Sequence, residues 1–252
     1  MKDMTLDIYS LMLASILVFI SIIFSRWQKL RLEKDIIVGT VRAVLQLTAV
    51  GFLLKYIFSL DNWIYTTLMM LIMVYNASNI AAKRGEGIEN GKPIAFVAIA
   101  AGAGATLAIL VAVGAIQYIP SEVIPISGMV IGNAMVAVGL CFRQMQQLFA
   151  DRAQEVEIKL SLGAPEKIAS MEIIRDSIRL AMQPTVDSLK TLGIVSLPGM
   201  MTGLILAGTP PLKAIQYQIM VTFMLTSTVS IATFTAGYMA YRRFFNDRRQ
   251  LI

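Results

Sequence analysis

Seven apolar segments, separated by polar connections, constrain this chain more than any other feature of its sequence. Most are about 20 residues long, the length that an α-helix needs to cross a hydrocarbon core about 30 Å thick. Only 15% of the 252 residues are charged and 56% are hydrophobic, unlike a soluble domain. The chain is therefore predicted to be an all-α polytopic membrane protein. The predicted spans are about Leu6–Phe24, Ile36–Phe58, Trp63–Ala82, Ile94–Ile116, Val123–Cys141, Thr185–Ala207 and Ala214–Tyr241.

Two of these segments have special features. The first carries no charge after Asp7 and is too long for the core of a signal peptide. Because basic residues follow it without a cleavage site, we expect it to be retained as a span. The sixth contains Pro198 and Gly199, which predict a kink or a break.

The residue types that are missing exclude several kinds of chemistry. The chain has one cysteine, Cys141, and no histidine, so it cannot form an internal disulfide, a cysteine cluster for zinc or a histidine-based catalytic triad. It has no G-x-x-x-x-G-K-[ST] sequence, so it cannot hydrolyse ATP through that loop. We therefore expect no enzyme activity and no cofactor bound by this chain.

Lysine and arginine fall mainly on alternate connections. The connections after the first, third, fifth and seventh segments are basic, whereas the other side has little beyond Lys2, Lys55 and Lys213. The positive-inside rule then predicts an N-terminus outside and a C-terminus in the cytoplasm, for a chain that we expect in the inner (plasma) membrane. This topology accounts for the formal charge of +6, so no nucleic-acid partner is expected.

The longest polar interval, from about Arg143 to Gln183, is predicted to be a cytoplasmic helical hairpin. The sequence Gly163-Ala164-Pro165 would divide it into two amphipathic helices. We expect Pro165 in the first turn of the second helix and Glu166 near its positive end. The apolar residues that recur at nearly helical spacing are Val156, Leu160, Gly163/Ala164, Ile168, Met171 and Ile174.

The centre of this interval, E-I-K-L-S-L-G-A-P at Glu157–Pro165, resembles the EAA-type loop of ABC importer permeases. In that family a short helix fits a groove on the ATPase subunit and transmits the closure of the nucleotide sandwich. The sequence departs from the family at Ile158 and Lys159, where two alanines are usual. A hairpin lying on the lipid surface is the alternative interpretation. The ATPase-coupling residues that the resemblance implies are Glu157, Leu160, Leu162, Gly163, Ala164 and Pro165.

Longer runs along the whole chain resemble one family of bacterial membrane proteins, the FetB family of ABC transporter permeases. The runs are L-E-K-D at Leu32–Asp35, V-I-P-I-S-G-M at Val123–Met129, G-N-A-M-V-A-V-G-L at Gly132–Leu140, K-L-S-L-G-A at Lys159–Ala164, I-R-D-S-I-R at Ile174–Arg179, P-T-V-D-S at Pro184–Ser188, V-S-L-P-G-M-M at Val195–Met201 and Q-Y-Q-I-M-V-T-F at Gln216–Phe223. The resemblance implies a homodimer of seven-helix permeases that export iron. It also implies separate FetA-like ATPase subunits, which bind ATP and Mg.

By the same resemblance, residues 1–252 would form a single permease domain with a coupling segment at about 143–183. Two alternatives stay open for the function. One is an ABC permease for another solute, such as a sugar nucleotide, and the other is an ATP-independent secondary transporter. The secondary transporter would need intramembrane carboxylates for ion coupling, and the second to sixth segments offer few.

Candidates for a transport path are polar groups and thioethers within or beside the apolar segments. They are Arg42, Gln46, Asn76, Asn79, Glu122, Asn133, Met129 and Met200. Simpler interpretations exist: snorkelling for the arginine, inter-helix hydrogen bonds for the asparagines, a helix N-terminus for the glutamate and flexible packing for the methionines. Asp187 and Lys190, three residues apart, are expected to form an ion pair at the cytoplasmic end of the sixth segment. The sequence specifies no metal ligands, and any iron carried would meet weak oxygen ligands or travel in a chelated form.

Overall fold

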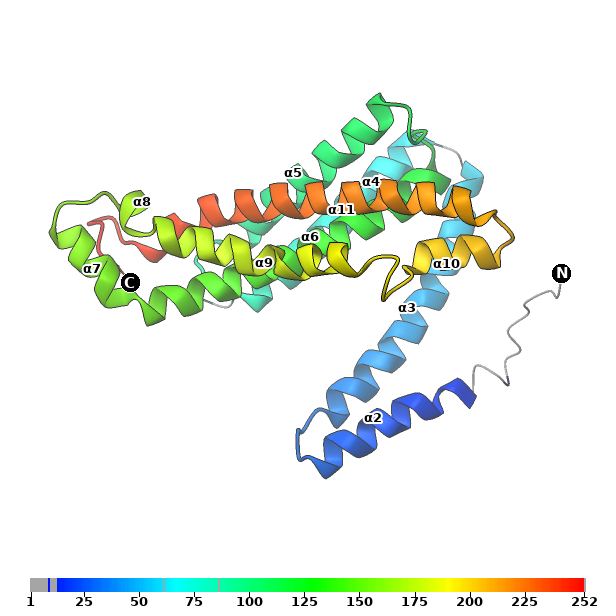
Figure 1. The fold of residues 1–252 in the computed structure, drawn as a ribbon, viewed down its shortest axis with the longest axis horizontal. Coiled ribbons are helices and arrows are strands. Elements are labelled where there is room, and N and C mark those ends of the chain that lie inside the picture. Colours follow the sequence, from blue (N-terminus) through cyan, green and yellow to red (C-terminus); the bar gives the residue numbers. More distant parts are fainter. Residues whose placement is uncertain (1–8, 10–12, 61, 86, 252) are drawn as a thin grey trace. The chain divides into compact units, whose positions relative to one another are not determined.

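The computed structural model describes residues 9, 13–60, 62–85 and 87–251, and the elements that it shows there are helices (Figure 1). The contacts divide the chain into two units, Met1–Leu60 and Asp61–Ile252, each with its own internal packing. Outside the helices, described residues pair in extended conformation at two points. These points are Leu192 with Ser196 and Phe245 with Leu251.

The first unit contains a pair of helices joined by a short turn. The turn closes on Ser25, whose hydroxyl accepts from the Leu32 N–H and donates to the Glu33 carboxylate, both at 3.1 Å. Glu33 lies in the first turn of the second helix, where the helix dipole favours a carboxylate. The two helices are α2 (Ile16–Trp27) and α3 (Glu33–Leu60).

Four long helices of the second unit pack against one another (Figure 1). They are α4 (Trp63–Arg84), α5 (Gly91–Ala112), α6 (Pro120–Asp151) and α11 (Pro211–Ala240). A small residue lets α5 and α11 approach closely, since a Cβ at Gly102 would lie 2.7 Å from the Thr228 carbonyl oxygen. The Thr228 hydroxyl donates to the Thr106 hydroxyl at 2.7 Å, so this buried polar pair is satisfied within the bundle.

Five described helices are long and apolar enough to cross a membrane. They correspond to the second, third, fourth, fifth and seventh predicted spans. The first predicted span is seen only in part, because residues 6–8 and 10–12 lie outside the described residues and α2 is a short apolar helix. The five ranges are Glu33–Phe58, Trp63–Arg84, Gly91–Ala112, Pro120–Asp151 and Pro211–Phe244, the last including the 3-10 helix η1 (Tyr241–Phe244).

The sixth predicted span, Thr185–Ala207, is not one continuous helix. Its start belongs to α9 (Met171–Thr191), residues 192–198 are irregular, and α10 (Gly199–Leu206) follows. Pro198 is the N-cap of α10 and confirms the predicted break. A proline there has no N–H for a continuing helix and restricts the residue before it to extended conformations.

The polar interval after the fifth span also differs from its predicted form. The helix of that span does not end at Cys141, because Phe142, Met145 and Phe149 continue a buried apolar stripe at helical spacing. Residues 171–183, at the other end of the interval, likewise belong to the long helix α9. The hairpin is therefore made of shorter helices than predicted. They are α7 (Ala153–Ser161) and α8 (Glu166–Ala169).

A candidate partner-docking hairpin

The turn between α7 and α8 is built around one glycine. Gly163 has φ +87°, a left-handed conformation that other residues rarely adopt. Its N–H donates to the Leu160 carbonyl at 2.9 Å, and the N–H of Ala164 donates to the Lys159 carbonyl at 3.0 Å. These two bonds form a Schellman motif, which satisfies carbonyls that the end of α7 would otherwise leave open. The sequence L-S-L-G-A therefore encodes the end of a helix.

The proline after this turn determines where α8 begins. Pro165 is the N-cap of α8, with φ −66° and ψ 152°. The prediction that it lies inside the first turn is wrong, because this extended ψ keeps it just outside the helix. Its carbonyl accepts from the N–H groups of Ile168 and Ala169. Glu166 does lie in the first turn, as expected from the helix dipole.

Ion pairs join the part of the chain that enters the hairpin to the helix that leaves it. Arg152 lies between α6 and α7, and its Nη1 is 3.1 Å from Oδ2 of Asp176 on α9. Lys159 Nζ contacts Glu155 at 2.6 Å and Glu172 of α9 at 3.5 Å. The hydrogen bond from Lys159 lowers the pKa of Glu155 below its ordinary 4.5, and the same bond raises the pKa of Lys159 above its ordinary 10.5. Glu155 and Lys159 are therefore both charged at neutral pH.

Apolar side chains of the hairpin fall into a buried set and an exposed set. Val156 of α7 and Ala169 of α8 are each 1% exposed and belong to the core. Leu162 is 82% exposed, and Ile158 and Ile168 are each 60% exposed. We call Ile158, Leu162 and Ile168 the hairpin tip. Large apolar side chains exposed beside charged ones are typical of a surface that binds a partner or lipid.

An open groove of about 610 Å³ lies beside the turn. Five of the six predicted coupling residues line it, and the sixth, Leu162, lies at the hairpin tip. The contribution of the C-terminus was not predicted, because the positive-inside rule alone accounts for Arg248 and Arg249 in the sequence. The lining residues are Glu157, Leu160, Ser161, Gly163, Ala164, Pro165, Arg248, Arg249, Gln250 and Leu251.

The C-terminal tail, which we define as residues 245–251, is anchored near the hairpin at two points. Phe244, just before it, stacks on Phe149 of α6 with ring centroids 4.1 Å apart. Arg249 Nε lies 3.6 Å from the Glu166 carboxylate of α8. The tail turns back on itself, with its first and last residues paired in extended conformation. The C-terminal tail therefore lies against the hairpin and lines part of the groove beside it.

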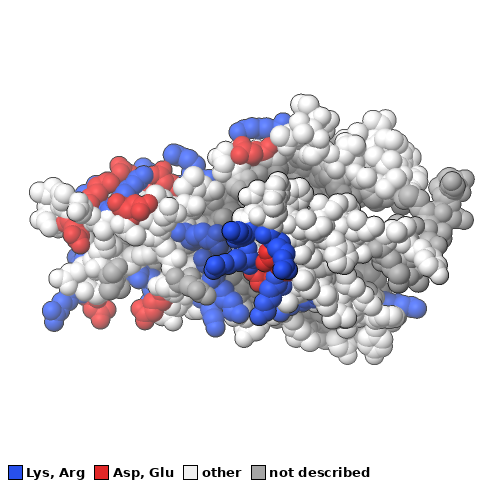
Figure 2. Space-filling model, turned by 90° about the horizontal axis from the view of Figure 1, so that it is seen from below, with Lys and Arg blue, Asp and Glu red and all other residues white. Residues whose placement is uncertain are grey.

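Several connections of the second unit meet at this end of the bundle. In the connection after α4, a Cβ at Gly85 would lie 2.5 Å from the Phe142 side chain of α6. Lys167 of α8 lies over the ring of Tyr238 near the end of α11, 5.7 Å from its centroid. Figure 2 shows charged side chains of both signs gathered where α7 and α8 lie. The basic connections after α4, α6 and α11 are thus on one side of the unit.

Among the described residues, no hydrogen bond or ion pair joins one predicted polar residue of a transport path to another. Arg42 and Gln46 are exposed on α3 in the first unit, and Asn76 is exposed on α4. Asn79 and Asn133 each donate an amide N–H to the carbonyl four residues earlier in their own helix, at 3.0 and 2.9 Å. These bonds leave the two amide oxygens as acceptors.

The other three path candidates make contacts that a structural role explains. The Glu122 carboxylate accepts from the Gln117 N–H at 2.7 Å, at the start of α6. Met129 and Met200 are partly buried and pack against the apolar core. Within the part of the chain that the structure describes, no group of three or more Cys, Asp or Glu side chains is arranged to hold a metal ion. A role in transport for these residues stays a prediction.

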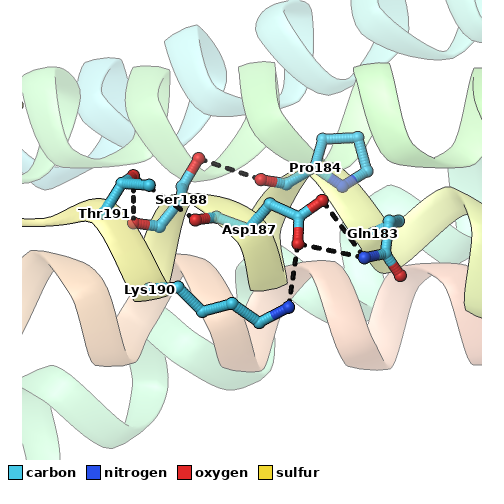
Figure 3. A network of polar contacts seen from close by, with 6 residues as sticks. All are labelled: Gln183, Pro184, Asp187, Ser188, Lys190 and Thr191. Atoms are coloured by element: carbon cyan, nitrogen blue, oxygen red, sulfur yellow. Dashed lines mark hydrogen bonds and ion pairs between the residues drawn. The ribbon is translucent and has the colours of Figure 1, made fainter. Parts of the chain in front are cut away.

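The expected ion pair between Asp187 and Lys190 is confirmed, with Oδ1 and Nζ 3.0 Å apart. The Gln183 side chain joins it, as Figure 3 shows. The pair does not lie at the start of a span as expected. Because α9 begins at Met171, the pair lies close to the C-terminal end of a long helix.

The helices and the hairpin together define a multi-pass, all-helical membrane protein. The chain belongs to the uncharacterised protein family UPF0014, whose model matches residues 8–245, so the resemblance inferred from the sequence is confirmed. It is 54% identical over 243 residues to the probable iron export permease protein FetB of Escherichia coli (strain K12), covering 96% of this chain and 94% of that protein.

Two plant proteins are also similar along most of the chain. The protein ALUMINUM SENSITIVE 3 of Arabidopsis thaliana is 35% identical over 238 residues, which cover 94% of this chain and 87% of that protein. The UPF0014 membrane protein STAR2 of Oryza sativa subsp. japonica is 36% identical over 238 residues, which cover 94% of this chain and 84% of that protein. No solved structure gives a significant match to the chain.

Proposed function

We propose that this chain is the permease subunit of an ABC transporter that exports iron and is driven by a separate ATPase subunit. The support for iron is the 54% identity to a probable iron export permease over nearly the whole of both chains. The support for an ATPase partner is the hairpin tip. Leu162, 82% exposed, stands on a turn fixed by a Schellman motif, whose two arms lead into helices of the bundle.

The proposed topology has seven spans in one permease domain, residues 1–252. Five are the long apolar helices, the first is the segment that ends in α2, and the sixth is the broken pair α9 and α10. Both α9 and α10 contact α11, which fits a broken helix that crosses the membrane beside it. The hairpin end, with its basic connections, faces the cytoplasm, and the N-terminus is outside. Two copies of the chain work together as a homodimer.

The proposed mechanism passes movement from the partner to the bundle through the hairpin. ATP and Mg bind on the ATPase subunits, and closure of these subunits displaces the hairpin tip. The ion pairs Arg152–Asp176 and Lys159–Glu172 make the two arms move as one body. Because α6 and α9 continue those arms, they shift against α11 and change the side of the membrane to which the path opens.

The cargo chemistry that fits this chain is weak oxygen ligation. Iron here is the substrate, and the amide oxygens of Asn79 and Asn133, which their own hydrogen bonds leave as acceptors, are the kind of hard ligand that suits a hydrated cation. A transported ion must bind well enough to enter the path and weakly enough to leave it. A path that offers the ion only a few weak contacts meets that requirement better than a site that removes the ion's water molecules.

The test is the ATPase rate of the chain reconstituted with its candidate ATPase, with and without ferrous iron. Two variants each add one carboxylate to an exposed position of α7 or its end: Leu162→Glu at the hairpin tip and Gln154→Glu away from it. We expect iron to stimulate the wild type and the Gln154→Glu control, and Leu162→Glu to lose this response. A normal response in Leu162→Glu would contradict coupling through the tip, and an unresponsive wild type would contradict iron as cargo.

A further inference from the structure

A polar network covers one face of α9 (Figure 3). The Gln183 amide donates to both carboxylate oxygens of Asp187, at 3.0 and 3.1 Å, and Lys190 Nζ lies 3.0 Å from Oδ1. All three side chains are exposed in the structure. Their spacing of four and three residues puts them on the same face of the helix. We call this set the α9 polar face.

The opposite face of α9 packs into the bundle. Ile174, Ser177 and Ala181 are buried, at 1% exposure or less, and α9 contacts both α6 and α11. Residues two positions apart on a helix point in nearly opposite directions, as do Ala181 and Gln183. The α9 polar face therefore points away from the helices that hold α9.

The contacts between α9 and α11 give the depth of this polar face. The two helices run antiparallel (Figure 1), and Ile178 of α9 is level with Gly237, where a Cβ would lie 3.0 Å from the Ile178 side chain. Gly237 is close to the end of α11 at Ala240. Asp187 lies about 13 Å beyond Ile178 along α9, and so about 18 Å from that end of a helix about 45 Å long. This is near the middle of α11.

The depth of the Asp187–Lys190 pair limits what can cover the α9 polar face. The range Pro211–Phe244 is apolar enough to cross a membrane, so groups level with the middle of α11 lie at the depth of the hydrocarbon core. Ionisable side chains at that depth face protein or water because lipid does not solvate them. The other described residues of the second unit leave the α9 polar face exposed, so its cover comes from outside that unit.

A second copy of the chain fits this cover by its charge. Asp187 and Lys190 put opposite charges side by side on one face, so the face is complementary to itself when a two-fold axis brings two copies together. Leu180, 45% exposed and on the same side of the helix, offers an apolar contact beside them. The Asp187 carboxylate and the Gln183 amide oxygen are oxygen ligands that a divalent cation accepts.

We propose that the α9 polar face lines a water-filled path between two copies of this chain, where Asp187 contacts a divalent cation in transit. Lys190 balances the Asp187 charge when the path is empty, and the incoming cation displaces it. This inference rests on the proposed function and names residues that carry it. The weak contact of a single carboxylate from each copy suits an ion that must also leave.

Cysteine accessibility tests the path in the full chain. In a Cys141→Ala background reconstituted into vesicles, Asp187→Cys and Gln183→Cys are exposed to a thiol reagent that does not cross membranes. Phe223→Cys is the control, because Phe223 is 69% exposed on α11 at a similar depth. We expect labelling at 187 and 183, slower labelling at 187 with ferrous iron present, and none at 223. Labelling of 187 no faster than 223 would overturn the path.

A second measurement tests the other copy and the role of Asp187. A bifunctional thiol reagent should link two copies through Asp187→Cys and not through Phe223→Cys, and the absence of such links would overturn the second copy as cover. Asp187→Asn should raise the ferrous iron concentration for half-maximal ATPase stimulation about tenfold. Ser188→Ala, which loses only a bond to the Pro184 carbonyl, should not. An unchanged response in Asp187→Asn would overturn the cation contact.

The two measurements also separate this inference from the function on which it rests. If iron fails to stimulate the wild-type complex, iron as cargo fails, while labelling at 187 still decides whether the polar face lines a path. If iron stimulates the wild type and 187 stays unlabelled, the transporter stands and the α9 path fails.

Discussion

Arg152 and Asp176 form an ion pair, Nη1 to Oδ2 at 3.1 Å, across the base of the hairpin. Arg152 directly follows α6, and Asp176 lies in the second turn of α9, so the pair joins two helices that belong to the bundle. Their side chains are 36% and 28% exposed, which keeps the energy of the pair small. In the proposed mechanism the pair matters for its geometry, since it joins the two helices that a displacement of the tip would move.

Breaking that pair should weaken coupling more than folding. We expect Arg152→Ala to lower the stability of the chain by about 1 kcal/mol or less, since the pair is partly exposed. Iron-stimulated ATPase activity should fall clearly, while Arg143→Ala, which removes an exposed arginine of α6, leaves it unchanged. Exchanging the two charges in Arg152→Asp with Asp176→Arg should restore part of the activity. Equal iron-stimulated ATPase activity in the wild type, the two single variants and the charge-exchanged variant would contradict this role for the ion pair.

Substituting the turn glycine should strain the hairpin without a clash. Apart from Gly163 and its two chain neighbours, no described residue has an atom within 4 Å of a Cβ built at Gly163, so the cost arises from φ +87°. Gly163→Ala should cost about 1–2 kcal/mol, and Gly163→Asn less, because asparagine tolerates positive φ. The measurement is the affinity of the ATPase subunit for the two variants. Weaker binding by the asparagine variant than by the alanine variant would contradict this ranking.

The pair Glu155–Lys159 should hold over a wide pH range. The pKa of Glu155 is lowered, so its contribution is present above 4.5 and is lost as the pH falls through the folded-state pKa. The pKa of Lys159 is raised, so its contribution is present below 10.5 and is lost as the pH rises through the folded-state pKa. A carboxyl NMR titration of Glu155 should give a midpoint below 4.5, and Lys159→Met should move it back up. A midpoint unaffected by that substitution would show that the pair does not form.

Loosening the C-terminal tail should expose it to protease. The stack of Phe244 on Phe149 is worth about 0.5–1.5 kcal/mol beyond its buried area. Phe244→Ala should therefore speed tryptic cleavage after Arg248 and Arg249, whereas Phe223→Ala, which removes an exposed aromatic ring of α11, should not. Equal cleavage rates in the two variants would mean that the stack does not hold the tail.

Five of the long helices could be predicted from the sequence, because the membrane interior and the protein core both require long, uninterrupted apolar segments. The end of the fifth span could not. Arg143 and its polar neighbours lower the average hydropathy, although Phe142, Met145 and Phe149 keep a buried face at helical spacing. The average hydropathy therefore falls before the helix ends, because the part of a helix that leaves the membrane needs only one apolar face.

The candidate site was predictable where its signal is local. Gly163 and Pro165 mark a helix end and a new start in any context. The contact of Phe149 with Phe244 joins residues far apart in the sequence, so no local pattern predicts that the tail lines the groove. The depth proposed for Asp187 also depends on where α9 begins, and Met171 starts that helix inside a stretch that looks like a polar connection.

The most direct test of the central claim is a photo-crosslinking residue at position 162, in membranes that contain the candidate ATPase. We predict a crosslink between this position and the ATPase, with a yield that changes when ATP is bound, and a much weaker crosslink from position 154. A crosslink from position 162 to lipid alone, with none to the ATPase in either nucleotide state, would contradict it, because the hairpin would then lie on the membrane surface.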